Sequence, residues 1–174
     1  MVGTSGSGKT LVAEALAAKL GIPYICNDAI LWRADWQPTA HDEAYAEFDA
    51  ATRAEAWTFD GNLGKADYDQ LVLSRCDTLV WLDLPFWQVI WGVTRRTTGR
   101  AITKEQLWHG NTERWRALFS RDSMIWWSVK TFSRRRRSYA ALFEDDAYAD
   151  RARIRLSSRR EVNEWLESLP GPAG

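Results

Sequence analysis

The sequence predicts an α/β fold in which helices pack against a mostly parallel β-sheet. Short apolar runs alternate with longer segments of helical periodicity along the chain, which is typical of such folds. The chain has 174 residues, of which 45% are hydrophobic, so it can form one domain with a complete apolar core. Because no internal repeat or linker is visible, we predict a single domain over residues 1–174.

The first half of the chain predicts three strands and two helices. Only Met1 and Val2 precede the first glycine, so the first strand is expected to be truncated. Thr39, with Asp42 three residues later, resembles a capping box and predicts the start of a helix. The other elements expected here are strands at Tyr24–Cys26 and Trp57–Phe59 and helices at Lys9–Leu20 and Thr39–Ala56.

The second half of the chain predicts two further strands among several helices. Thr78–Leu82 is the clearest strand, because it is an apolar run that ends at an acidic residue and a proline. Ser158 and Glu161 form a capping box that predicts a closing helix to about Leu169. The other elements expected are a strand at Arg153–Leu156 and helices over 65–75, over 86–100 and, as a pair, within 101–143.

The strongest functional signal is a phosphate-binding loop at residues 3–10, which matches the pattern GxxxxGK[ST] in full. Glycines let backbone N–H groups wrap around a phosphate, and the helix that follows directs its positive N-terminus at the same anion. A lysine in this pattern reaches the β- and γ-phosphates, and the next hydroxyl binds Mg²⁺. We therefore predict that ATP and Mg²⁺ bind at Gly3, Thr4, Ser5, Gly6, Ser7, Gly8, Lys9 and Thr10.

Three aspartates follow predicted strands, at the sheet edge where parallel α/β folds bind ligands. We expect Asp60 beside the phosphate-binding loop, where it would help Thr10 to hold Mg²⁺, and Asp28 at the hydroxyl of an acceptor. Capping of a turn is the alternative role for both residues. Asp83 is interpreted as a structural turn residue, because Leu84 and a proline follow it.

Arginines dominate the second half of the chain and can neutralise charge on a transferred phosphoryl group. Arg95, Arg96 and Arg100 surround Gly99, which we interpret as the pivot of a lid extending over residues 95–137. At most two residues of the run 134–137 can face one ligand, because successive helical side chains point about 100° apart. We assign Arg135 to the ATP site. A solvated basic face or a nucleic-acid patch is the alternative for the run.

Composition limits the remaining partners. The formal net charge is zero, which argues against bulk attraction to nucleic acid or to an anionic membrane. No apolar run reaches membrane-spanning length, no leader is visible, and the two cysteines form no paired motif, so a cytoplasmic location is expected. Most of the 11 tryptophans are expected in the core, although Trp32, Trp36 and Tyr45 could instead line an acceptor pocket over residues 28–60.

Taken together, these residues resemble adenylate kinase-like P-loop proteins, and among them the bacterial group described as topology modulation or FlaR-like proteins. The resemblance spans nearly the whole chain. Its carriers are the loop at 3–10, Asn27-Asp28-Ala29 with Leu31-Trp32, Asp60-Gly61-Asn62, Leu82-Asp83-Leu84-Pro85, the arginines at 134–137 and the segment 156–162.

The resemblance implies a three-layer P-loop NTPase fold with a parallel sheet of order 2-3-1-4-5, a truncated first strand and a helical lid. It also implies an ATP-dependent phosphotransferase that acts on a small acceptor with Mg²⁺. An ATP-binding regulatory or nucleic-acid-associated protein without kinase turnover is the alternative. Asn62-Leu63-Gly64 replaces the Phe-Pro-Arg that follows this Asp-Gly in adenylate kinases, so the arginine that grips AMP there has no counterpart, and the acceptor remains open.

Overall fold

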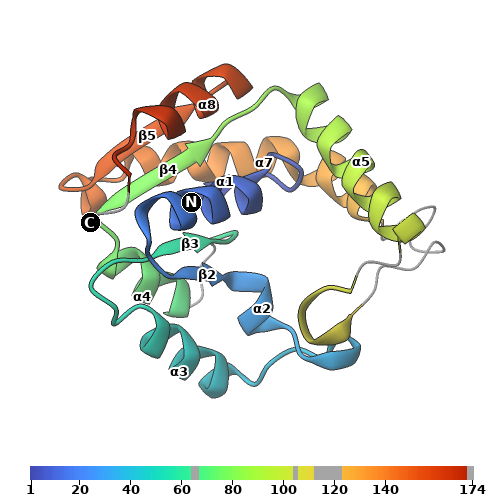
Figure 1. Ribbon diagram of the computed structural model, residues 1–174, viewed down its shortest axis with the longest axis horizontal. Helices are drawn as coiled ribbons and strands as arrows, with labels where there is room; N and C mark the ends of the chain where they lie inside the picture. Colours follow the sequence, from blue (N-terminus) through green and yellow to red (C-terminus); the bar gives the residue numbers. More distant parts are fainter. Residues whose placement is uncertain (64–66, 104–105, 112–122, 172–174) are drawn as a thin grey trace.

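The computed structural model describes residues 1–63, 67–103, 106–111 and 123–171, and parallel strands with helices on both faces form its core (Figure 1). The predicted α/β class is therefore confirmed. The strands are β1 (Val2–Gly3), β2 (Tyr24–Cys26), β3 (Thr58–Asp60), β4 (Thr78–Leu82) and β5 (Ala152–Leu156). They agree with the expected strands to within a residue at each end.

The strands pair in two groups, β2 with β3 and β1 with β4 and β5 in the order β1-β4-β5. The pairing is parallel throughout, with Cys26 opposite Asp60 and Val2 opposite Trp81. Met1 links the two groups, because its backbone nitrogen donates to Phe59 O at 2.6 Å and its carbonyl accepts from Gly61 N at 3.5 Å. The carboxyl ends of β1, β2 and β3 thus lie near one another.

Alternate residues along the strands pack against helices on opposite faces. Val80 and Leu82 pack with Val12 of α1 (Lys9–Leu20) and Val162 of α8 (Arg159–Ser168). Trp81 and Val2 instead pack with Tyr139 of α7 (Met124–Glu144), which covers the other face. This alternation follows from the two-residue period of a strand and gives three layers.

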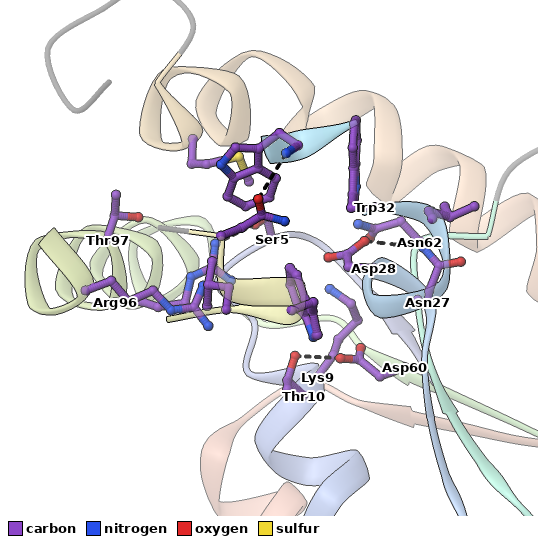
Figure 2. Close-up of a pocket in the computed structure, with 18 of the residues that line it drawn as sticks. Ser5, Lys9, Thr10, Asn27, Asp28, Trp32, Asp60, Asn62, Arg96 and Thr97 are labelled. Carbon is purple, nitrogen blue, oxygen red and sulfur yellow. Dashed lines mark hydrogen bonds between the residues drawn. The ribbon is translucent and has the colours of Figure 1, made fainter. Parts of the chain in front are cut away.

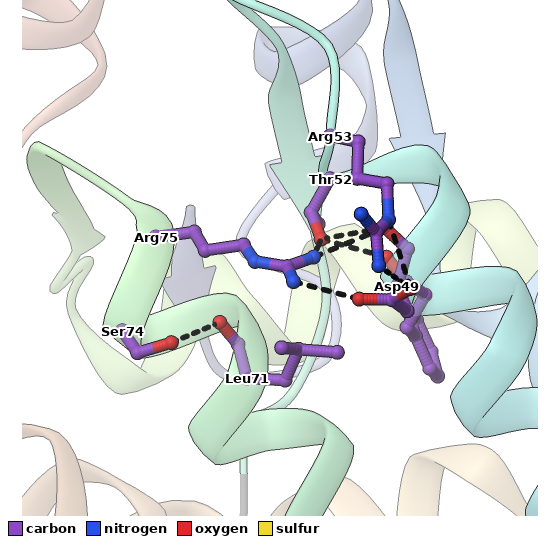
Figure 3. Close-up of polar contacts among 7 residues, drawn as sticks. Asp49, Thr52, Arg53, Leu71, Ser74 and Arg75 are labelled. Carbon is purple, nitrogen blue, oxygen red and sulfur yellow. Dashed lines mark hydrogen bonds and ion pairs between the residues drawn. The ribbon is translucent and has the colours of Figure 1, made fainter.

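Beyond β2 and β3, a second apolar cluster is closed by α3 (His41–Ala51) and α4 (Asp67–Arg75). Phe48 of α3 is fully buried and stacks on Tyr68 of α4 at a centroid distance of 5.0 Å. The ends of the two helices are joined by Asp49, whose carboxylate accepts from Arg53 and Arg75 (Figure 3). These bonds hold the pKa of Asp49 below its usual value, with Arg53 as the larger contributor.

Two sequence-based helix predictions are wrong at their ends. The helix expected from Thr39 to Ala56 is α3, which begins at His41 and ends at Ala51. Thr39 does not cap it, because its hydroxyl donates to Ile30 O at 2.5 Å, on the preceding segment. The helix expected to end at residue 100 is α5 (Phe86–Thr103). Gly99 therefore lies inside a continuous helix and is not a pivot.

Other predictions at element ends are confirmed. The Ser158 hydroxyl accepts from Glu161 N, which is the capping bond expected at the start of α8, and the Glu161 carboxylate accepts from the Ser158 hydroxyl and from Ser157 N. Of the two helices expected within 101–143, the later one is α7, whereas residues 104–105 and 112–122 lie outside the described part of the chain. The remaining elements are α2 (Asn27–Leu31) and the 3₁₀ turns η1 (Ala34–Trp36), η2 (Trp108–Gly110) and η3 (Asp146–Tyr148). Within the described ranges, every helix is too short or too polar to cross a membrane.

Candidate functional site

A cavity of about 980 Å³ opens at the carboxyl end of the sheet, between the phosphate-binding loop, α2 with η1, and the helices α5 and α7 (Figure 2). It collects residues that are distant in the sequence, from Ser5 to Arg135. Most of the predicted site residues contribute to its lining, namely Ser5, Lys9, Thr10, Asp28, Asp60, Arg96, Arg100 and Arg135. The structure therefore brings together side chains that separate sequence patterns predict.

The glycine-rich loop fits closely against α5. Gly6 has φ 89°, and a Cβ placed on it would lie 2.4 Å from Val89 O. Gly92 of α5 faces it, since a Cβ there would lie 2.3 Å from Gly6 O. Backbone meets backbone at this contact, so neither position can accept a side chain without moving the loop or the helix. The contact fixes the position of α5, and therefore of Arg96, relative to the loop.

Lys9 lies at the first position of α1 and is buried, with only 9% of its surface exposed. Its amine donates to Thr4 O at 3.4 Å, which folds the side chain back along the loop. Burial lowers the pKa of Lys9, and the negative charge of Asp60 partly opposes this effect. A buried cation with one long hydrogen bond has unused donor capacity, and Figure 2 shows its amine directed into the cavity.

Thr10 and Asp60 are in direct contact at the floor of the cavity. The Thr10 hydroxyl donates to Asp60 Oδ2 at 2.5 Å, and β3 presents this carboxylate from a position that is only 7% exposed. Asp60 Oδ1 and Ser7 Oγ are buried and have no hydrogen-bond partner in the described part of the chain. Uncompensated buried oxygens beside a lysine are unusual in a finished core and are consistent with a site that binds a ligand.

The described residues contain no cluster of three His, Cys, Asp or Glu side chains that could enclose a metal ion. Mg²⁺ does not need such a cage, because it typically uses one or two protein oxygens together with phosphate and water. Thr10 Oγ1 and Asp60 Oδ1 supply a hydroxyl and a carboxylate of this kind. The residues present therefore fit an ion that arrives with a nucleotide.

Asp28 extends from α2 toward the cavity and is half-buried. Its carboxylate accepts from the side-chain amide of Asn27 at 3.3 Å, so one oxygen remains available to the cavity. Figure 2 shows Asp28 beneath Trp32 and above Lys9. This position lies between the loop and the aromatic part of the cavity.

The three arginines predicted on α5 do not behave alike. Arg96 donates to the Ser5 hydroxyl at 3.4 Å, and Arg100 lines the cavity one turn further along the same face. Arg95 is exposed and does not line the cavity, because it lies about 100° around the helix from Arg96. The structure therefore does not bring Arg95 into the site.

The arginine run on α7 divides among different surroundings. Arg135 lines the cavity, stacks over the Trp127 ring at 4.7 Å and donates to the Tyr139 hydroxyl. Arg136 pairs instead with Asp83 on the far side of the helix, at 2.7 Å. Arg134 and Arg137 are exposed. The assignment of Arg135 to the cavity side and the structural role of Asp83 agree with these contacts, whereas the four arginines do not form one basic surface.

Two turns of the same shape form the far end of the cavity. In η1, Arg33 N donates to Gln37 O at 2.7 Å around a residue with φ 56°, and in η2, Leu107 N donates to Asn111 O at 2.7 Å around a residue with φ 55°. Asn111 joins the turns, because its amide donates to Arg33 O at 2.8 Å and its Oδ1 accepts from Trp36 N at 3.0 Å. This pairing brings Trp36 and Trp108 to the cavity wall.

Sequence reasoning missed several lining residues at this end of the cavity. Trp32 and Trp36, two of the three aromatic residues considered for an acceptor pocket, line the cavity, whereas Tyr45 does not. The residues that no sequence pattern indicated include Asp35, Thr97, Trp108, Asn111 and Trp127. They depend on contacts between segments that are distant along the chain, and only the aromatic composition hinted at them.

Comparison with known proteins adds no family assignment. The sequence matches none of the protein-family models compared with it and none of the curated proteins.

Proposed function

We propose that this protein is an ATP-dependent phosphotransferase that moves a phosphoryl group to a small acceptor. In this proposal, residues 3–10 form a P-loop for the triphosphate, Thr10 and Asp60 hold Mg²⁺, and Asp28 meets the acceptor. The finer fold assignment is part of the proposal. The bonds of Met1 between β1 and β3 support a continuous sheet of order 2-3-1-4-5 in a P-loop NTPase fold.

The contact between Thr10 and Asp60 is the observation that carries the proposal. A glycine-rich loop alone could be a structural turn. Here the hydroxyl that ends the motif touches a buried carboxylate at the end of β3, and that carboxylate keeps one oxygen unpartnered among the described residues. Phosphotransferases with this loop use such a hydroxyl–carboxylate pair to hold Mg²⁺ against the phosphates.

Each remaining side chain has a role that matches its position. Lys9 would bind the β- and γ-phosphates, and a phosphate beside it would compensate for its burial. Arg96, Arg100 and Arg135 would neutralise charge that develops on the transferred group. Asp28 would orient the acceptor hydroxyl and take up its proton. Mg²⁺, when bound, would supply charge neutralisation between the phosphate oxygens.

The first experiment measures binding and turnover of ATP with Mg²⁺ in the wild-type protein and in Lys9→Ala. We expect Lys9→Ala to lower turnover by about a hundredfold or more, because it removes a phosphate contact. Its thermal unfolding should be little changed, since the amine makes one weak hydrogen bond. Lys130→Ala, which removes an exposed lysine from α7, is the matched control. Equal turnover in the Lys9 and Lys130 variants would refute the proposal.

A further inference from the structure

The two sides of the cavity carry opposite chemistry. The side formed by residues 27–62 contributes carboxylates, amides and indoles and, among its described lining residues, no lysine or arginine. Its members are Asn27, Asp28, Leu31, Trp32, Asp35, Trp36, Asp60, Gly61 and Asn62. The cations lie on the loop and on the two long helices, as Lys9, Arg96, Arg100 and Arg135. Figure 2 shows Arg96 across the cavity from Asp28 and Trp32, whereas Lys9 lies below Asp28.

The indoles on this side are positioned by contacts with each other and with Asn111. Trp32 and Trp36 meet edge to face, with ring centroids 6.2 Å apart and an angle of 73° between the rings. The backbone of Trp36 is fixed by Asn111, which is itself only 4% exposed. Trp108 reaches the same end of the cavity from η2. Aromatic surfaces beside amide and carboxylate groups suit a ring compound that stacks on an indole and carries hydroxyls.

The charge distribution restricts that ring further. A phosphate or carboxylate on the acceptor would approach Asp28 and Asp35, and like charges at an interface disfavour binding. The cations on the opposite wall would already be engaged by the triphosphate under the proposed function. An acceptor without anionic groups avoids both problems and leaves Asp28 as the nearest base for its hydroxyl.

We infer that the acceptor is an alcohol with no anionic group and with a ring face that stacks on an indole, either a nucleoside or a sugar. This inference rests on the proposed function. In the transfer, the acceptor oxygen forms a bond to the γ-phosphorus as the bond from that phosphorus to the β-γ bridging oxygen breaks. The hydroxyl proton passes to the Asp28 carboxylate, and ADP leaves with the bridging oxygen.

Matched pairs of ring compounds test the inference directly. Binding of adenosine against AMP, and of glucose against glucose 6-phosphate, is measured by calorimetry on the protein loaded with Mg²⁺ and a non-hydrolysable ATP analogue. We expect the uncharged member of one pair to bind at least about tenfold more tightly than its phosphate ester. Tighter binding of adenosine than of AMP would indicate a nucleoside acceptor, and tighter binding of glucose than of glucose 6-phosphate would indicate a sugar. Tighter or equal binding of the phosphate esters, or binding of neither member in both pairs, overturns the inference.

Two variants locate the binding surface. Trp32→Ala should weaken the preferred ring compound by about tenfold, because a stacking face is lost, and should leave affinity for the ATP analogue unchanged. Trp87→Ala is the matched control, since this tryptophan is 68% exposed on α5 and does not line the cavity. Equal effects of the two variants would contradict the inference. If the wild-type protein did not bind the ATP analogue at all, the proposed function itself would be refuted. The two failures are therefore distinguishable.

Discussion

Replacing Asp83 with alanine tests whether this aspartate is structural, because it occupies the strand-end position that could otherwise serve a metal ion. Its side chain is 3% exposed, and Arg136 and Arg155 both donate to it. Arg136 makes two bonds, of 2.7 and 3.0 Å, and Arg155 Nε makes one of 3.0 Å. The carboxylate therefore joins the end of β4 to α7 and β5.

The expected loss of stability in Asp83→Ala depends on how exposed the carboxylate and its two arginine partners are. Hydrogen bonds to charged groups contribute about 1.5–3 kcal/mol each. The arginine side chains are 50% and 52% exposed, so water replaces much of what they lose. Counting one bond for each arginine gives a loss of about 3 kcal/mol from the free energy of unfolding. For a chain of this length, that corresponds to a fall of about 6–12 °C in Tm.

Urea unfolding, monitored by circular dichroism at constant pH, measures this loss, with Arg137→Ala as the exposed control from the same helix. We expect the control to stay within about 0.5 kcal/mol of the wild-type protein. Affinity for ATP should be unchanged in Asp83→Ala, because Asp83 does not line the cavity. A loss of less than about 1 kcal/mol, or weakened ATP binding with unaltered stability, would show that the structural assignment is wrong.

Two further predictions concern the cavity. Burial lowers the pKa of Lys9, so the empty site loses this proton at a pH below the ordinary lysine pKa of about 10.4. ATP affinity should therefore fall as pH rises toward that value, and binding should take up protons. Calorimetry in buffers of different ionisation enthalpy checks this, and a slope retained in Lys9→Gln would contradict it. Asn111→Ala should speed hydrogen exchange of the Trp36 amide by about tenfold, since its acceptor is removed, while exchange in β4 stays unchanged. Unchanged exchange at Trp36 would show that Asn111 does not join the turns.

Local sequence signals predicted the features that neighbouring residues decide. The Ser158–Glu161 capping box formed because both partners lie within one helical turn. The similar signal at Thr39 failed, because its hydroxyl found Ile30 O within reach across a tight connection. The prediction of a hinge at Gly99 failed for a different reason. The residues around it continue the helix, and a single glycine costs only about 1 kcal/mol in such a context.

The aromatic end of the cavity depends on contacts that no local pattern encodes. Asn111 reaches Arg33 and Trp36 across more than seventy intervening positions, with a sequence separation of 75 for Trp36. An isolated asparagine in a loop usually indicates only a turn. Gly92 is similar, because its importance appears only when Gly6 lies against it. The sequence could therefore suggest aromatic lining residues but not their arrangement.

Three aspartates with the same sequence signal end up in three different environments, and the elements packed over each one account for the difference. Asp83 is covered by Arg136 and Arg155, which use both of its oxygens. Asp60 receives the Thr10 hydroxyl on one oxygen, and its other oxygen has no partner within the described residues. Asp28 is half-buried at the cavity wall, and its carboxylate accepts from the side-chain amide of the neighbouring Asn27. A position at the end of a strand thus makes a carboxylate a candidate site residue. Whether it can bind a ligand or a proton depends on which of its oxygens the surrounding residues leave without a partner.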